Sequence, residues 1–227
     1  ERRMRAVVFD LDGTLSDTIV SIAYCANRAL EKFGLQGFET DRYKYFVGDG
    51  AAELIRRTLI NQKRERMDLY EQVKEEYAKL FAVDCMYQVK PYDGIRELLS
   101  ELKTRGVKIA VFSNKPHENT CKVIHDLFGD DVFDVVQGQV PEIEKKPSPE
   151  GVYMISEKLG IPVEEMLYVG DTNTDMQTGK NAGAFTVGVL WGFRDRKELE
   201  ENHADAIIAA PQELLKYLLG KDGANAI

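Results

Sequence analysis

Short apolar, β-branched runs alternate with longer amphipathic stretches along most of the chain. The runs have the length of buried strands and lie at residues 6–9, 107–112, 132–136, 166–169, 184–190 and 206–209. The amphipathic stretches have helical spacing and lie at residues 94–103, 116–127, 149–159, 174–181 and 211–219. Strands that alternate with helices favour a mostly parallel sheet covered on both faces, because each parallel crossover carries the chain back over the sheet. We therefore predict an α/β protein with a Rossmann-like parallel-sheet core.

One region breaks this alternation. Between residues 16 and 90 there is no convincing strand, and the apolar spacing is helical at 19–33, 41–46, 51–59 and 66–81. An all-helical block between the first and second strands of an α/β chain is best interpreted as an inserted domain. We predict a catalytic core of residues 1–15 and 91–227, and a small helical cap domain of residues 16–90.

Composition narrows the class of protein. The chain has 227 residues, 44% hydrophobic and 30% charged, which fits one large globular domain or a domain with an insert, at roughly 100 to 200 residues per domain. Three widely spaced cysteines without a CxxC pair favour a reducing compartment. No apolar run reaches the length of a membrane span. We expect a cytoplasmic protein without a membrane partner.

The net charge of −8 argues against a nucleic-acid partner, because phosphate backbones are bound by clustered basic surface. The charge of a whole chain does not decide the charge of one cleft, so a small anion remains an acceptable ligand. Nothing in the sequence indicates an oligomeric state.

Two carboxylates and a glycine follow the first predicted strand. Asp10, Asp12 and Gly13 stand where open α/β sheets bind ligands, at the carboxyl end of a strand. Side chains two apart on a strand share a face, so these two acids would repel each other when ionised, unless a cation lies between them. The alternative is an ordinary acidic turn closed by Gly13.

Polar residues also follow the second and third predicted strands. Ser113 and Asn114 precede a helix N-terminus, where a hydroxyl and free backbone N–H groups suit a phosphate, although either residue can simply cap the helix. Lys146 precedes a Pro-x-Pro turn whose fixed backbone can aim its side chain, although such a lysine is often only a surface residue.

The fourth predicted strand ends in two more acids, Asp171 and Asp175, which can also serve as helix-capping residues. Four strand ends of one parallel sheet thus direct polar groups toward the same edge. Several carboxylates at one place indicate a hard divalent cation, Mg²⁺ by default. A lysine and a hydroxyl beside them indicate a phosphoryl group as the ligand.

These motifs together resemble the four motifs of the haloacid dehalogenase-like phosphatase superfamily, in order and over nearly the whole chain. The segments that carry the resemblance are Asp10-x-Asp12-Gly13-Thr14-Leu15, Ser113-Asn114, Lys146-Pro147-x-Pro149 and Gly170-Asp171-x-x-x-Asp175. The helical insert resembles the small helical cap of that superfamily. Further similarity to its phosphoglycolate phosphatase branch lies in Asp17, Asn27, Leu30 and Gly34, in Gly48-Asp49-Gly50 and in Gly192-Phe193-Arg194.

The resemblance implies a role for each residue. Asp10 would be the nucleophile that forms an aspartyl phosphate, and Asp12 the general acid and base. Mg²⁺ would be held by Asp10, by the main-chain carbonyl of Asp12 and by Asp171. Asp175 would hold a water ligand of the metal or orient Lys146. The residues expected to bind the phosphoryl oxygens are Ser113, Asn114 and Lys146.

The resemblance also places the leaving group of the substrate against the cap. The candidate residues are Gly48, Asp49, Gly50 and Arg56, with Arg57 as a neighbour of the last. Gly48 and Gly50 can equally be ordinary helix punctuation. A cationic cap residue would suit a carboxylated phosphoester, so the expected partner is a small phosphorylated metabolite, with 2-phosphoglycolate as the leading candidate.

Other activities of the superfamily stay open, namely pyrophosphatase, nucleotidase and sugar phosphomutase. Mutases related to β-phosphoglucomutase usually carry a histidine twelve positions after the nucleophile, and this position is Ile22 here. A phospho-accepting receiver module, from a different class, also uses an aspartate at a strand end. The helical insert and Asp12 argue against it, because a receiver has no leaving group to protonate.

Overall fold

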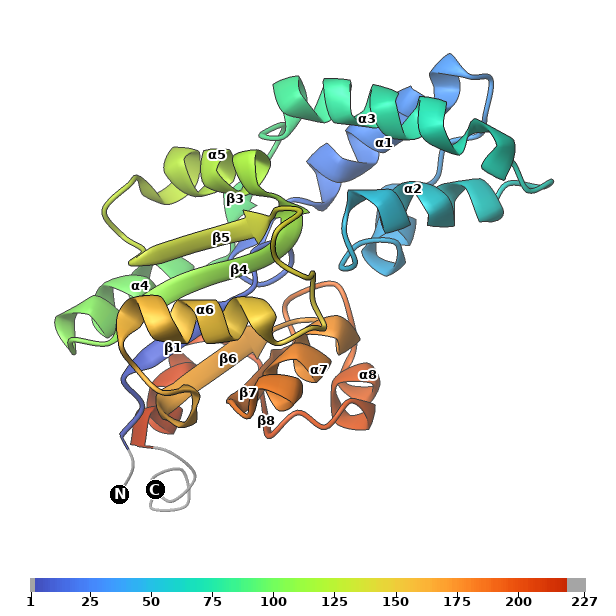
Figure 1. Ribbon diagram of the computed structural model, residues 1–227. Coiled ribbons are helices and arrows are strands. Elements are labelled where there is room, and N and C mark those ends of the chain that lie inside the picture. The colour runs from blue at the N-terminus through green and yellow to red at the C-terminus, as the bar shows by residue number, and fades with distance from the viewer. Residues whose placement is uncertain (1–2, 220–227) are drawn as a thin grey trace.

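Six parallel strands form the central sheet of the protein (Figure 1). The computed structural model describes residues 3–219. The strand order is β5-β4-β1-β6-β7-β8, and every neighbouring pair is parallel. The strands are β1 (Ala6–Phe9), β4 (Lys108–Pro116), β5 (Val135–Gln139), β6 (Met166–Gly170), β7 (Phe185–Val189) and β8 (Ala206–Ile208). The predicted α/β class is confirmed.

Alternating side chains of the buried strands supply two separate hydrophobic layers. Val7 and Phe9 of β1 belong to one layer, and Ala6 and Val8 belong to the other, because successive side chains of a strand point to opposite faces. Helices α4 (Ile95–Thr104) and α5 (His117–Phe128) and the 3₁₀ helix η4 (Pro211–Leu219) cover the first face. Helices α6 (Glu150–Leu159) and α7 (Asn173–Ala182) cover the second.

A block of helices stands beside the carboxyl edge of the sheet (Figure 1). It contains α1 (Ile19–Lys32), η1 (Thr40–Tyr45), α2 (Ala51–Ile60), η2 (Met67–Leu69) and α3 (Tyr70–Asp84). These helices, which we call the helical block, share a hydrophobic cluster distinct from the two layers of the sheet. Phe193 joins that cluster from the segment after β7.

Strands occur at both ends of the helical block, where the sequence predicts none. Ser16–Asp17 (β2) and Lys90–Pro91 (β3) pair antiparallel, so the chain leaves and re-enters the sheet region through two hydrogen-bonded segments. Two residues are too few to show a hydrophobic period, which is why the pattern misses them. The domain limits at residues 16 and 90 stay a prediction.

Other elements differ from the prediction in smaller ways. The predicted strand at 132–136 begins at Val135, because Val132 and Phe133 pack against the core from the preceding loop. The predicted helical stretch at 211–219 is a 3₁₀ helix. Two short helices, η3 (Val163–Glu165) and α8 (Arg196–Glu201), were not predicted.

The strand order creates a crevice at one place on the sheet. From β1 the chain continues to β4 and β5 on one side, and then crosses to β6 on the other side of β1. Open α/β sheets bind ligands beyond the carboxyl ends of the strands at such a switch point. The predicted polar residues after β1 and β6 and at the end of β4 therefore meet at one edge.

Candidate active site

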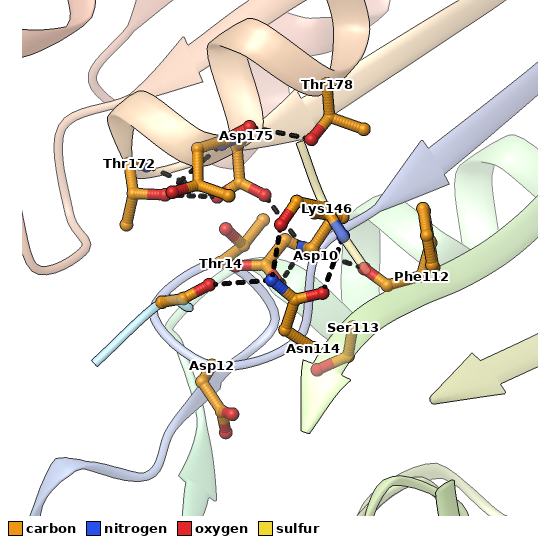
Figure 2. A network of polar contacts seen from close by, with 12 residues as sticks. Asp10, Asp12, Thr14, Phe112, Ser113, Asn114, Lys146, Thr172, Asp175 and Thr178 are labelled. Atoms are coloured by element: carbon orange, nitrogen blue, oxygen red, sulfur yellow. Dashed lines mark hydrogen bonds and ion pairs between the residues drawn. The ribbon is translucent and has the colours of Figure 1, made fainter. Parts of the chain in front are cut away.

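A buried lysine joins two of the predicted aspartates. Lys146, in the loop between β5 and α6, donates to Asp10 Oδ1 and to Asp175 Oδ1, each at 2.9 Å, and to the carbonyl of Phe112 at 3.1 Å (Figure 2). Lysine is seldom fully buried without partners, and these three acceptors account for its burial. The predicted surface alternative for Lys146 is wrong.

Asp175 uses both of its carboxylate oxygens within the protein. Oδ1 accepts from Lys146 and from the hydroxyl of Tyr168, and Oδ2 accepts from Thr172 and from the backbone N–H of Asp171. Thr172 and Asp175 form a capping box at the start of α7. Burial opposes ionisation of Asp175, but Lys146 holds the pKa of this carboxyl below its usual value. This geometry supports the expectation that Asp175 orients Lys146.

Asp10, Asp171 and Asp175 form an acidic cluster that can accept a cation. Each residue offers a carboxylate oxygen within 4.8 Å of the others. Burial, followed by the charge of Asp175, raises the pKa of Asp10 well above its usual value. The same two causes raise the pKa of Asp171 to about 7. A divalent cation with oxygen ligands would relieve this repulsion. Asp10 accepts from Lys146, and Asp171 accepts one bond on each oxygen, from Thr14 Oγ1 and from the backbone N–H of Phe193, so both acids keep lone pairs for a cation.

Two glycines allow the chain to pass close to Asp171. Gly13 has φ +88°, and a Cβ there would lie 2.1 Å from Asp171 Oδ2. A Cβ at Gly192 would lie 2.4 Å from Asp171 Cβ and 2.2 Å from the carbonyl oxygen of Gly13. Any side chain at either position would displace the Asp171 carboxyl, so the acidic cluster requires glycine at both positions.

The Asp12 side chain points away from the acidic cluster (Figure 2). Its Oδ1 accepts from Thr18 Oγ1 at 2.6 Å and from Lys115 Nζ at 3.0 Å. A metal contact from Asp12 would therefore come from its main chain, as the resemblance implies. The carboxylate lines a neighbouring cavity, which is where a leaving group would have to be protonated.

Ser113 and Asn114 have different surroundings at the end of β4. Ser113 Oγ accepts from the backbone N–H of Lys115 at 3.1 Å and lines the cavity, so its proton is available to a ligand. The Asn114 amide donates to the carbonyls of Gly48 and Lys146, each at 3.1 Å, and accepts from the backbone N–H of Lys146 at 2.9 Å. Asn114 thus fastens the Lys146 loop and the helical block to β4, and its phosphate-binding role stays a prediction.

A cavity of about 50 Å³ lies between the sheet edge and the helical block. A water-sized group needs roughly 10–15 Å³ of such space, so the cavity has room for a few water-sized groups. The sheet side of its wall includes Asp10, Asp12, Ser113, Asn114 and Lys115, and the helical side includes Ile22, Val47, Gly48, Gly50, Leu54, Tyr77 and Phe81.

The candidate residues in the helical block divide into two groups. Gly48 and Gly50 line the cavity. The Asp49 carboxylate lies outside it, bound by Thr174 Oγ1 and Arg57, and the Asp49 carbonyl accepts from Lys145. Arg56 does not line the cavity either, because its guanidinium pairs with Glu53 on the surface of α2. The placement of Arg56 gives no support to the expected contact with the leaving group.

Sequence reasoning missed Lys115, whose side chain is only 3% exposed. Its ammonium donates to both Asp12 oxygens, at 3.0 and 3.2 Å, and lies 4.6 Å from the centre of the Phe81 ring. The available signal was a lysine directly after Ser113 and Asn114 at the end of an apolar strand. A charged side chain at the end of a buried strand either pairs with a buried partner or contacts a ligand.

Arg194 is a second residue without a predicted role. Its Nε donates to the Lys44 carbonyl at 2.9 Å, and its Nη2 donates to the Val47 carbonyl at 2.7 Å. Glu198 balances its charge at 3.1 Å. Arg194 thereby ties the segment after β7 to the helical block.

The acidic cluster and the buried Lys146 thus lie together at the switch point of a parallel α/β sheet, beside the helical block. The chain belongs to the haloacid dehalogenase-like hydrolases, whose family model matches residues 7–189. The predicted resemblance is thus confirmed, and the protein is a phosphoric monoester hydrolase rather than a receiver module.

Similar proteins match this chain over nearly its whole length. The phosphoglycolate phosphatase of Aquifex aeolicus is 34% identical over 215 residues, which cover 95% of this chain and 97% of that protein. The phosphoglycolate phosphatase of Neisseria meningitidis is 33% identical over 220 residues, covering 95% and 94% of the two chains. A solved structure from Lactobacillus delbrueckii subsp. bulgaricus has a TM-score of 0.88 and 29% identity, covering 96% and 100%.

No helix within residues 3–219 combines the length and the apolar character needed to cross a membrane.

Proposed function

We propose that the protein is a Mg²⁺-dependent phosphatase for a small carboxylated phosphomonoester, with 2-phosphoglycolate as the leading substrate. The observation that carries the proposal is the buried Asp10–Lys146 pair at the switch point, next to a small cavity lined by Asp12. The names of the similar proteins from Aquifex and Neisseria support the choice of substrate.

The reaction uses the two carboxylates in turn. Asp10 attacks phosphorus, the bond from phosphorus to the ester oxygen breaks, and the leaving oxygen takes a proton from Asp12. Asp12 then removes a proton from the water that attacks the aspartyl phosphate, which releases phosphate and restores Asp10. Lys146, fixed by Asp175, holds charge beside Asp10 throughout. The hydroxyl of Ser113 is free to donate to a phosphoryl oxygen.

The residues that would hold Mg²⁺ are Asp10 and Asp171, with the main-chain carbonyl of Asp12. An all-oxygen donor set suits this ion, and the raised pKa values of the two acids fit a site that is completed by a cation. When bound, Mg²⁺ supplies positive charge that neutralises the phosphoryl oxygens as Asp10 approaches.

Residues 16–90 act as a cap in this proposal. The contacts from Asn114, Lys145, Thr174 and Arg194 to the helical block hold it against the sheet edge, and the cavity lies between them. Closure of such a lid excludes water and brings the leaving group against cap side chains. The paired segments β2 and β3 are the connections about which the cap would move.

The residues and size of the cavity favour hydrolysis of a small phosphomonoester over sugar phosphomutase or nucleotidase activity. Ile22, at the position of the mutase histidine, lines the cavity and offers no group that carries a proton. A space of about 50 Å³ suits a leaving group of a few atoms better than a nucleoside.

We also propose a cytoplasmic location. Cys25, Cys85 and Cys121 are all free thiols, and two of them are buried. Free thiols are typical of reducing compartments.

The nucleophile is tested by Asp10→Asn. We expect phosphate release from 2-phosphoglycolate to fall at least about 1,000-fold, because an amide cannot form the phosphoenzyme. Circular dichroism and the melting temperature should show an intact fold. Asp130→Asn, at an exposed aspartate that contacts His125, is the matched control and should leave turnover unchanged. Turnover of Asp10→Asn near the wild-type rate would contradict the assignment.

The substrate is tested by measuring phosphate release from a panel of phosphomonoesters with and without Mg²⁺. We expect the highest kcat/KM for small carboxylated esters and little turnover after chelation. Inactivity on every ester would overturn the proposed function.

A further inference from the structure

Lys115 is the only Lys or Arg side chain among the described residues that line the cavity. The other cations near the site have partners elsewhere. Lys146 lies between Asp10 and Asp175, Arg57 is bound to Asp49, and Lys145 is bound to the Asp49 carbonyl. Any negative charge on the leaving group therefore has one cation to meet inside the cavity.

The contacts of Lys115 fix where its charge lies. Asp12 holds the ammonium from the sheet side, and the ring of Phe81 packs against it from the helical block. An ammonium has three N–H donors, so it can keep Asp12 as a partner and still donate to a ligand. The rest of the helical side is mainly apolar, with Ile22 and Leu54 in the wall, which strengthens any ion pair formed there.

The position of Asp12 relates this charge to the reaction. In the proposed function Asp12 protonates the ester oxygen, so that oxygen must lie within hydrogen-bond distance of the Asp12 carboxylate. Lys115 Nζ lies 3.0 Å from the same carboxylate. In an ester of a 2-hydroxy acid the carboxylate carbon is two bonds from the ester oxygen. Such a carboxylate falls within reach of Lys115.

We propose that Lys115 is the residue that selects a carboxylate on the leaving group, and that the preferred substrates are phosphate esters of small 2-hydroxy acids. This inference rests on the proposed function. The sequence predicts that Arg56 or Arg57 of the cap recognises the leaving group. In this inference Lys115, near the end of β4, recognises it instead. The cap supplies the apolar wall, and the sheet edge supplies the charge.

The test compares two esters that differ in one charge, 2-phosphoglycolate and 2-phosphoglycolamide. The readout is the ratio of their kcat/KM values for the wild type, Lys115→Met and Lys115→Arg. We expect Lys115→Met to lower the ratio about 10- to 100-fold, as the loss of a charged hydrogen bond implies. Lys115→Arg should retain part of the preference because it keeps the charge. Lys74→Met, at a lysine outside the cavity that pairs with Glu71, is the control and should keep the wild-type ratio.

Binding provides a second measurement that does not depend on turnover. In the Asp10→Asn background, calorimetry with 2-phosphoglycolate and Mg²⁺ should show a Kd about 10- to 100-fold higher when Lys115→Met is added. A melting temperature for each variant shows that it is folded.

The outcomes separate the two proposals. An equal fall of kcat/KM on both esters in Lys115→Met would mean that Lys115 acts only on Asp12, and would overturn the selection role. A wild type that hydrolyses both esters equally well would overturn it too, while leaving the phosphatase assignment in place. A wild type that releases phosphate from no ester would overturn the proposed function, and this inference with it.

Discussion

Asp171 and Asp175 stand four residues apart at the same sheet edge, and their pKa values move in opposite directions. Both are buried, and burial raises the pKa of a carboxyl. Asp175 overcomes this because Lys146 and Tyr168 donate to it, whereas Asp171 has the Asp175 charge as a neighbour. One acid is therefore a fixed anion that positions a lysine, and the other is available to a cation.

The raised pKa of Asp171 makes metal affinity depend on pH. Below about pH 7 this carboxyl holds a proton in the metal-free protein, and the proton competes with the cation. The pKa of Asp10 is raised as well, which steepens the effect. For the Asp171 proton alone, we expect the Mg²⁺ affinity to increase by up to about tenfold per pH unit below pH 7, and this contribution to level off above pH 8.

Calorimetric titration with Mg²⁺ at pH 6, 7, 8 and 9 tests this dependence, and proton uptake by the buffer gives an independent reading. Asp134→Asn, at a residue whose partners are Lys108 and the backbone N–H of Ile109, should keep the same profile. An affinity that does not change between pH 6 and 8 would contradict the pKa assigned to Asp171.

At the scale of elements, the segment between β7 and α8 joins the two parts of the molecule. Gly192 passes the Asp171 carboxyl, Phe193 enters the hydrophobic cluster of the helical block, and Arg194 donates to two carbonyls of that block. The backbone N–H of Phe193 also donates to Asp171 Oδ2 at 3.0 Å. Three consecutive residues thus contact the helical block and position Asp171 of the acidic cluster.

Removing the Arg194 contacts should weaken closure of the helical block. We expect Arg194→Ala to lower kcat/KM about tenfold, because two hydrogen bonds to the block are lost. Arg194→Lys should recover little of this, since one ammonium does not reproduce the fork of a guanidinium. Steady-state kinetics on 2-phosphoglycolate measures the effect.

Arg196→Ala, at an exposed arginine that pairs with Glu200, is the matched control for Arg194→Ala and should behave as the wild type. The role of Arg194 in closure would be refuted by unchanged kinetics in a variant whose melting temperature is also unchanged.

At the scale of the whole molecule, the net charge of −8 and a phosphate-binding site are compatible. Three of the acids are buried together at the switch point, where repulsion acts against the folded state. A bound cation attracts all three carboxylates and therefore stabilises the folded state. The charge close to a bound phosphate is then determined by the metal site, Lys146 and Lys115, and not by the net charge of the chain.

Mg²⁺ should therefore stabilise the folded protein. At a concentration of about 100 times Kd the linkage contributes about 2.7 kcal/mol. For a chain of this size we expect the melting temperature to increase by roughly 5–10 °C. Differential scanning calorimetry with Mg²⁺ and with a chelator measures the shift.

The Asp171→Asn variant should lose most of this increase in melting temperature, because it lacks one of the proposed ligands. An equal increase in Asp171→Asn and in the wild type would show that Mg²⁺ acts at another place.

The sequence by itself determined the fold class and the acidic residues that follow β1 and β6, because hydrophobic period is a local property and parallel strands bring their carboxyl ends to one edge. Ser113 and Asn114 lie within β4, and Lys146 lies in the loop after β5, so these two predicted strand ends differ from the structure. The sequence also identified the aspartates that the structure gathers into a cluster. The strands β2 and β3 were missed because two residues carry no period.

Only the tertiary structure decided which polar groups became partners. Lys115 and Asp12 are 103 positions apart, and Lys146 and Asp10 are 136 apart, so no spacing in the sequence relates them. Arg56 illustrates the same limit: its charge is predicted to meet the leaving group, but in the structure it pairs with Glu53 and does not line the cavity. A charged side chain takes the partner that burial and distance provide, and those exist only once the chain is folded.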